Sequence, residues 1–292
     1  MKRASDVPRL GREVVAQAAK LSDPEVRFVV SNYYLAQEQR KRGDMQLRHL
    51  GEREFPELLQ YATDGYAVIE SQIKRVLKAF AENRKMGVWM MKQDGIAEVL
   101  SAGFLAHLTL THTDKTTGEI VPTATVGHWY SFAGLEPDKK WKKGHKRPWN
   151  ADLKQLCFHA GECFKRISYK PEAFYGQIYH QRKAMIEERN ERGHYAERAK
   201  TFFTNSDDVK KVLAQGKLPA LNLDRQACNY AVKIFLSHLH ALWFYDHYGE
   251  PPPKPFAIAI LGHAHELPIP DTDMFPGFDA AYFGRQAGKK RA

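Results

Sequence analysis

The chain has 292 residues, of which 43% are hydrophobic and 12% aromatic, so it can bury a core and is neither a disordered tail nor a disulfide-stabilised miniprotein. Its 44 Lys and Arg exceed its 34 Asp and Glu, for a formal net charge of +10, which favours a polyanionic partner. We find no apolar stretch long enough to span a membrane, no apolar run of a secretory signal at the N-terminus, and three cysteines rather than a disulfide framework. We therefore expect a cytoplasmic protein without a membrane partner.

Residues 1–85 are predicted to form a helical N-terminal region. Ser22–Glu25 combines capping residues with a proline suited to a first helical turn, so a helix begins there and continues to about Gln39. From Asp64 onward, apolar residues recur with the period of an α-helix, with basic residues beside them. This pattern predicts a long amphipathic helix that ends near Gly87.

Residues 86–200 are predicted to contain a helical hairpin that carries a small insertion. The apolar segment 88–93 and the helical segment 98–108 are separated only by a tight turn, which is typical of an αα-hairpin. The alternating segment His107–Thr111, a turn-like stretch and the apolar pair Ile120–Val121 follow. They predict a small β-hairpin or a loop insertion.

The rest of this region is predicted to consist of helices before and after one basic loop. A short helix at 126–133 is terminated by Gly134, and the segment 138–150 has no helical period and is predicted to be a loop. Asn150 can cap the next helix, whose apolar stripe is the clearest in the chain. A helical pattern also covers Pro171–Lys200.

The last region, residues 201–292, is predicted to combine a helix with an extended tail. The helix covers Asp224–Tyr248, and the Pro- and Gly-rich residues 251–292 show little periodicity. The predicted fold class is therefore mainly α. It has a helical N-terminal region, a helix-hairpin-helix core with a small β-hairpin or loop insertion, and a helical C-terminal region with an extended arm.

The basic loop is the clearest candidate for a functional site. It holds six Lys or Arg within nine residues and two tryptophans; flexible cations suit phosphates, and an indole can stack on an unpaired base. A solvated charged loop without a ligand is the alternative interpretation, although such loops usually interleave acidic residues. The candidate residues are Lys139, Lys140, Trp141, Lys142, Lys143, His145, Lys146, Arg147 and Trp149.

The turn of the helical hairpin is a second candidate. A helix N-terminus presents unpaired backbone N–H groups that a phosphate can accept, and glycine lets that phosphate approach closely. We therefore assign Gly95, Ile96 and Ala97 to nucleic-acid binding. The alternative is an αα-hairpin with a purely structural role.

Histidines and cysteines give a weaker signal. Five histidines fall in one part of the chain: His238, His240, His247, His263 and His265. The first two are two residues apart and diverge on a helix, so we expect histidines of the core edge and surface rather than a metal site. We expect structural cysteines, no metal ligands, no catalytic residues and no cofactor, with Mg²⁺ needed only if the protein is catalytic.

Three segments in a fixed order resemble a known family. They are Gln93–Ala106, Phe132–Pro137 and the helix start Asn150–Lys154, with the basic glycine-containing loop between the last two. This set is similar to the C-terminal domain of insertion-sequence transposases of the bridge-RNA-guided DEDD class. The similarity covers roughly residues 86–170 apart from an insertion at 111–125.

The resemblance implies a helix-hairpin-helix module that grips nucleic acid in proteins that cut and rejoin DNA. This chain departs from the family at three points. First, Ala97 replaces the second hairpin glycine. Second, members carry a nucleophilic serine in the loop, whereas Glu136–Asn150 contains no Ser or Thr. Third, members have an RNase H-like nuclease domain with metal-binding carboxylates, whereas residues 1–85 are predicted to be helical. Ser131 precedes the motif and has no base beside it in sequence.

The sequence thus predicts a stand-alone, transposase-like protein of a mobile element or phage, bacterial or phage-encoded. It is expected to bind the phosphate backbone with the hairpin and the basic loop, without catalysis of its own. DNA is the favoured partner and RNA the alternative, and a homo-oligomer is an open option. Two other functions stay open: an active DNA strand-transfer enzyme, and a structural or assembly protein of a phage or nucleoprotein particle.

Overall fold

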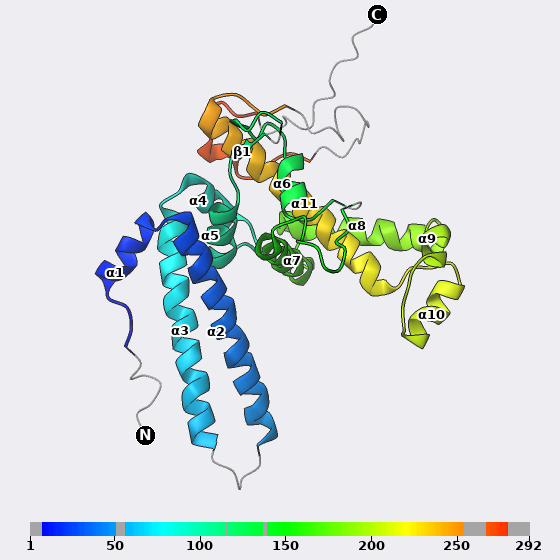
Figure 1. The fold of residues 1–292 in the computed structure, drawn as a ribbon, viewed down its shortest axis with the longest axis horizontal. Coiled ribbons are helices and arrows are strands. Elements are labelled where there is room, and N and C mark those ends of the chain that lie inside the picture. The colour runs from blue at the N-terminus through cyan, green and yellow to red at the C-terminus, as the bar shows by residue number, and fades with distance from the viewer. Residues whose placement is uncertain (1–7, 51–55, 115, 137–138, 254–266, 280–292) are drawn as a thin grey trace, which may run out of the picture. The chain divides into compact units, whose positions relative to one another are not determined.

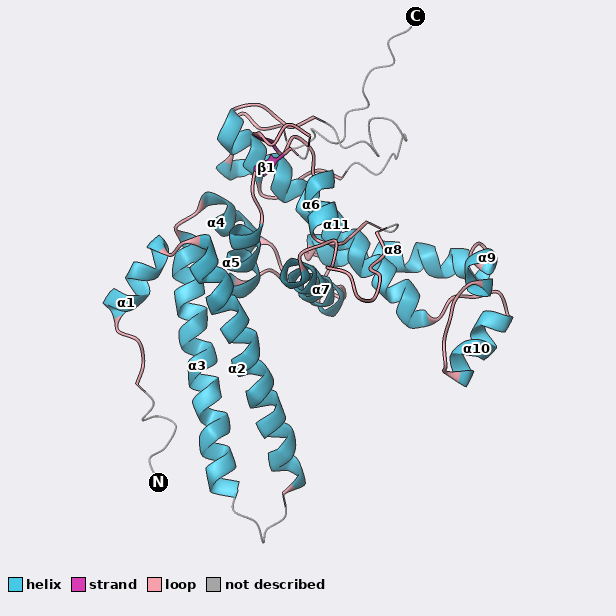
Figure 2. Cartoon of the chain, viewed as in Figure 1, coloured by secondary structure: helices cyan, strands magenta, loops and turns pink. Residues whose placement is uncertain are grey.

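The computed structural model describes residues 8–50, 56–114, 116–136, 139–253 and 267–279. Helices make up most of this part of the chain (Figure 2), which confirms the predicted mainly α fold with a small β-hairpin. Two compact units are present. Residues 1–91 with 97–109 form the first, and residues 92–96 with 110–292 form the second, a division that differs from the three regions expected from the sequence.

The first unit is built on a long helical hairpin. Helices α2 (Asp23–His49) and α3 (Pro56–Glu82) lie side by side (Figure 1). The backbone N–H of Ser22 donates to the Glu25 carboxylate at 2.8 Å, so α2 begins where its capping box predicts. Among the described residues, four other helices complete the unit: α1 (Arg12–Gln17), the short 3₁₀ helix η2 (Ala18–Lys20), nearly all of α4 (Lys85–Lys92) and α5 (Glu98–His107).

The single helix predicted to reach Gly87 is in fact two. Helix α3 ends at Glu82, and α4 (Lys85–Lys92) begins after a short break. The Arg84 side chain holds this break, because it donates to the carbonyl oxygen of Phe80 at 2.9 Å. A Cβ at Gly87 would lie 2.1 Å from the carbonyl oxygen of Ala81. Glycine therefore allows α4 to turn against the end of α3.

The second unit has its core among three helices, α7 (Ala151–Arg166), α8 (Phe174–Glu191) and α11 (Ala220–Tyr248). The rings of Phe164, Tyr175 and Phe235 pack together, with centroids 5.2–5.8 Å apart, so one aromatic cluster joins all three.

Two helix boundaries in this unit differ from the prediction. The helix expected over Pro171–Lys200 is divided into α8 and α9 (Ala196–Lys200), because Gly193 adopts a positive φ of 77°. Helix α11 begins after Pro219, before the predicted start at Asp224. The unit also contains α10 (Asp207–Ala214), which the sequence interpretation did not include.

The predicted β-hairpin is present in the second unit. Strands β1 (Thr111–Thr113) and β2 (Ile120–Pro122) pair antiparallel, with Thr111 opposite Pro122. The first strand begins after the expected segment at 107–111, because α5 continues to His107. The short helix predicted at 126–133 is α6 (Gly127–Phe132), and Gly134 follows it with a φ of 66°.

Part of the predicted extended tail can be placed. Residues 254–266, which include His263 and His265, and residues 280–292 lie outside the described part of the chain. Residues 267–279, with the 3₁₀ helix η3 (Thr272–Met274), pack on the second unit. There Phe275 is 2% exposed, and the Tyr245 hydroxyl donates to the carbonyl oxygen of Pro276 at 2.9 Å. Among the described residues, we find no helix with the length and apolar character needed to cross a membrane.

Candidate nucleic-acid interface

The basic loop is fixed at both ends to the last turn of α6. At its start, the Lys139 ammonium donates to the hydroxyl oxygen of Ser131. At its end, the backbone N–H of Asn150 donates to the carbonyl oxygen of Phe132 at 2.8 Å. The Asn150 side chain accepts from the backbone N–H of Leu153 at 2.8 Å, which caps α7 as predicted. The loop therefore leaves α6 and returns to it before α7 begins.

Trp149 is held by protein contacts within this loop. On one side, a Cβ at Gly134 would lie 2.7 Å from the indole Cγ. On another, the Lys154 ammonium lies 3.9 Å from the ring centroid, a cation–π distance. Burial lowers the pKa of Lys154 below its ordinary value, and the nearby Arg147 lowers it further. These contacts fix Trp149 to the protein, and its assignment to nucleic-acid binding stays a prediction.

Replacing Gly134 with alanine should detach this anchor. The positive φ disfavours any side chain, and the new methyl group would overlap the indole of Trp149, so we expect a loss of about 2 kcal/mol in the free energy of unfolding. Urea unfolding measures it. Gly144→Ala is the matched control, because Gly144 has a φ of 87° but no atom within 4 Å of a built Cβ. Equal losses in the two variants would contradict the contact with Trp149.

The centre of the loop is exposed and turns back on itself. The backbone N–H of His145 donates to the carbonyl oxygen of Lys142 at 3.1 Å, with Gly144 at positive φ between them, as in a type II turn. The Trp141 indole N–H donates to the carbonyl oxygen of His145 at 2.6 Å, and 45% of Trp141 remains exposed. The exposed residues with a cationic or ionisable side chain are Lys140, Lys142, Lys143, His145, Lys146 and Arg147.

The hairpin turn exists, but two of its three predicted residues face protein. A Cβ at Gly95, which has a φ of 89°, would lie 3.1 Å from Ile167 and 3.4 Å from Phe164. Ile96 is 3% exposed, and its backbone N–H donates to the carbonyl oxygen of Gln93 at 3.0 Å. Gly95 thus lies against the end of α7, and Ile96 is buried with its backbone N–H bonded within the turn.

Ala97, the third predicted residue of the hairpin turn, is exposed. It is the N-cap residue of α5 and provides no side-chain cap. Of the three hairpin residues assigned to nucleic-acid binding, Ala97 is therefore the exposed one.

A polar cluster that sequence spacing did not reveal joins α7 to α11. The candidate ligand atoms of Glu162, Asp224 and Cys228 lie within 4.8 Å of one another. However, Asp224 accepts from Lys165 at 2.8 Å, Glu162 accepts from Arg225 at 2.6 Å, and burial raises the pKa of the Cys228 thiol to about 11. Cationic partners already compensate both carboxylates, so the cluster fits an ion-pair network.

The described histidines of α11 include two that lie in the core. His238 and His240 are each 2% exposed. The hydroxyl of Tyr175 and Nδ1 of His238 lie 2.9 Å apart, and Nε2 of His240 lies 2.8 Å from the carbonyl oxygen of Thr123. These contacts fit structural histidines.

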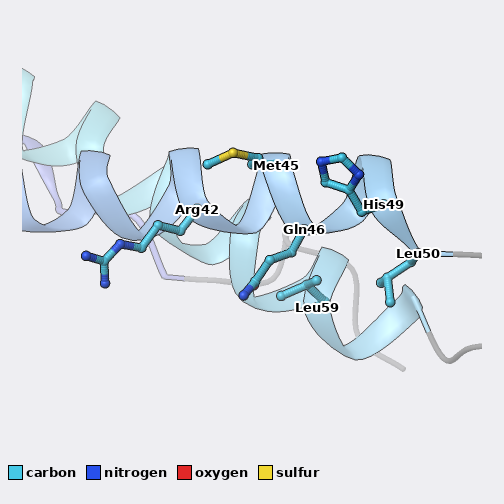
Figure 3. A pocket seen from close by; sticks show the side chains of 6 residues that line it. All are labelled: Arg42, Met45, Gln46, His49, Leu50 and Leu59. Carbon is cyan, nitrogen blue, oxygen red and sulfur yellow. The ribbon is translucent and has the colours of Figure 1, made fainter. Parts of the chain in front are cut away.

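A pocket elsewhere in the protein contains none of the predicted residues. It lies in the first unit at the end of the α2–α3 hairpin (Figure 3). Its lining mixes apolar and polar side chains: Arg42, Met45, Gln46, His49, Leu50 and Leu59. The predicted loop residues all belong to the second unit.

No protein-family model, curated protein or solved structure matches the chain. The resemblance to the transposase domain stays a prediction from the ordered motifs of residues 93–106, 132–137 and 150–154.

Proposed function

We propose that this protein binds nucleic acid through its basic loop, as a transposase-like protein of a mobile element or phage without catalysis of its own. One observation carries the proposal. The segment Lys139–Trp149 contains no acidic residue, and its exposed cations are displayed on a loop that is fixed at both ends. Such a loop presents several positive charges together at little cost in conformational entropy.

Phosphate groups are the natural ligands of this surface. Lysine ammonium groups are flexible point charges that bind phosphate without reading base sequence. The proposed binding is therefore mainly to the nucleic-acid backbone, with DNA favoured and RNA the alternative. Trp141, which is half exposed, adds a ring that can stack on a base.

Removing four exposed lysines should weaken binding and flatten its dependence on salt. The variant replaces Lys140, Lys142, Lys143 and Lys146 with alanine and keeps Lys139, because Lys139 anchors the loop. Each lost phosphate contact lowers the log–log salt slope on duplex DNA by about 0.9. We expect a slope smaller by up to about 3.6 and an affinity about a hundredfold lower. Fluorescence anisotropy over a range of salt concentrations measures both.

A matched control separates the loop from net charge. Lys200, Lys210, Lys211 and Lys217 belong to the same unit and are each paired with a carboxylate. Changing them to alanine removes the same charge and should leave the slope nearly unchanged. Equal effects of the two variants, or no binding of any nucleic acid at low salt, would contradict the proposal, and the second result would favour an assembly role.

A further inference from the structure

The first turns of α7 extend the exposed surface of the basic loop. Lys154, Phe158 and Lys165 recur at i, i+4 and i+11, a spacing that places them in one stripe. All three are exposed, Phe158 to 44%. With a rise of about 1.5 Å per residue, Lys154 and Lys165 lie about 16 Å apart along the axis. Gly161, at i+7 on the same side, is buried against Cys228 of α11, and Lys165 beyond it is paired with Asp224. The exposed part of the stripe next to the loop is therefore Lys154 and Phe158.

Phe158 is not an isolated surface ring. The guanidinium of Arg225, from α11, lies 4.1 Å from its centroid, and Arg225 is held there by Glu162 at 2.6 Å. An ion pair that holds a cation against an aromatic ring also fixes the ring, so its position is set before any ligand binds. The ring remains partly accessible to solvent.

We propose that the loop and the exposed start of α7 bind a single-stranded nucleic acid, with an unpaired base stacked on Phe158 and phosphates near Lys154 and the exposed loop lysines. The inference rests on the proposed function and specifies its substrate class. In a duplex, bases are stacked on each other and are closed to an aromatic side chain on a helix surface. Alternating aromatic and cationic groups suit a single strand, whose bases have free faces.

The aromatic rings and the lysines of this surface have different roles in the proposed binding. Trp141 in the loop and Phe158 on α7 are the aromatic platforms, each close to half exposed. Trp149 lies between them in sequence and fixes the loop to Gly134. The exposed lysines of the loop supply the part of the affinity that depends on salt, and the rings supply a part that does not.

The test compares single strands with duplexes of the same sequence, as both DNA and RNA oligonucleotides at fixed salt. Phe158→Ala should weaken binding to single strands about tenfold and leave binding to duplexes unchanged. Phe158→Tyr keeps the ring and should retain the affinity. Phe203→Ala is the matched control, because Phe203 is also exposed, to 87%, and lies in the same unit between α9 and α10 rather than on α7.

Three outcomes would overturn the inference. They are unchanged single-strand binding in Phe158→Ala, an equal loss on duplexes, and an equal loss in Phe203→Ala. In each case, a salt slope that still depends on the loop lysines would leave the proposed function standing. Absence of all nucleic-acid binding would instead remove both.

Discussion

Replacing Asp224 with alanine is expected to lower the free energy of unfolding by about 3 kcal/mol. Asp224 is 5% exposed, and its carboxylate accepts from Tyr179 at 2.5 Å and from Lys165 at 2.8 Å. Lys183 lies 3.6 Å away. Alanine would leave the Tyr179 hydroxyl without its acceptor and the Lys165 ammonium without its ion-pair partner, whereas Lys183 keeps Glu187 at 3.1 Å. Urea unfolding at neutral pH measures the loss.

The pKa of Asp224 shows that its charged form is stabilised. Burial acts to raise this pKa, but Lys165, Tyr179 and Lys183 outweigh burial and hold it below its ordinary value of 3.8. Asp224→Asn, which keeps an acceptor for Tyr179 but not the charge, should therefore lose less stability than Asp224→Ala. Glu162→Ala serves as a control at a more exposed ion pair and should cost at most about 1 kcal/mol. A loss of that size for Asp224→Ala would contradict the buried network.

Acid should destabilise the second unit well before its carboxylates are protonated. Burial lowers the pKa of His238 to about 3 and that of His240 to about 4. In both cases a hydrogen bond to a backbone carbonyl acts to raise the pKa, but burial has the larger effect. The unfolded chain binds a proton at each histidine near the ordinary value of 6.5, whereas the folded chain does not. Stability is therefore complete above pH 6.5 and falls as the pH drops below it.

The expected loss at pH 5 is about 2 kcal/mol for each of the two histidines, relative to pH 7.5. Urea unfolding at the two pH values measures it. His240→Gln preserves a donor toward the carbonyl oxygen of Thr123 and cannot be protonated, so it should remove about half of the pH dependence. A free energy of unfolding that does not change between the two pH values would contradict the buried, neutral histidines.

The parts of the fold that could be predicted from the sequence depend on local chemistry. Ser22 and Asn150 cap α2 and α7 as their side chains predict, and Gly134 follows α6 at positive φ. The break between α3 and α4 could not be predicted, because it depends on Arg84 reaching the carbonyl oxygen of Phe80 and on the approach of α4 to Ala81. Tertiary contacts decide such boundaries.

The candidate site likewise has features that the sequence predicts and features that depend on tertiary contacts. An exposed, cationic loop follows from its composition, and the structure confirms the exposure of its central residues. The anchoring of Trp149 by Gly134 could not be foreseen, because the two residues are far apart in the sequence and meet only where the loop returns to α6. Phe158 and Arg225 lie on different helices, so no spacing rule along the sequence would pair them.

Because both ends of the basic loop are attached to one turn of α6, changes within the loop have little effect on the rest of the fold. Ser131 and Phe132 hold the two ends, so the intervening segment is a closed loop between neighbouring points. Doubling the length of such a loop costs only about 0.6 kcal/mol. Insertions, deletions and exchanged charges between Lys140 and Pro148 can therefore accumulate at small cost to folding. The length and charge of this loop can therefore change while the fold around it stays the same.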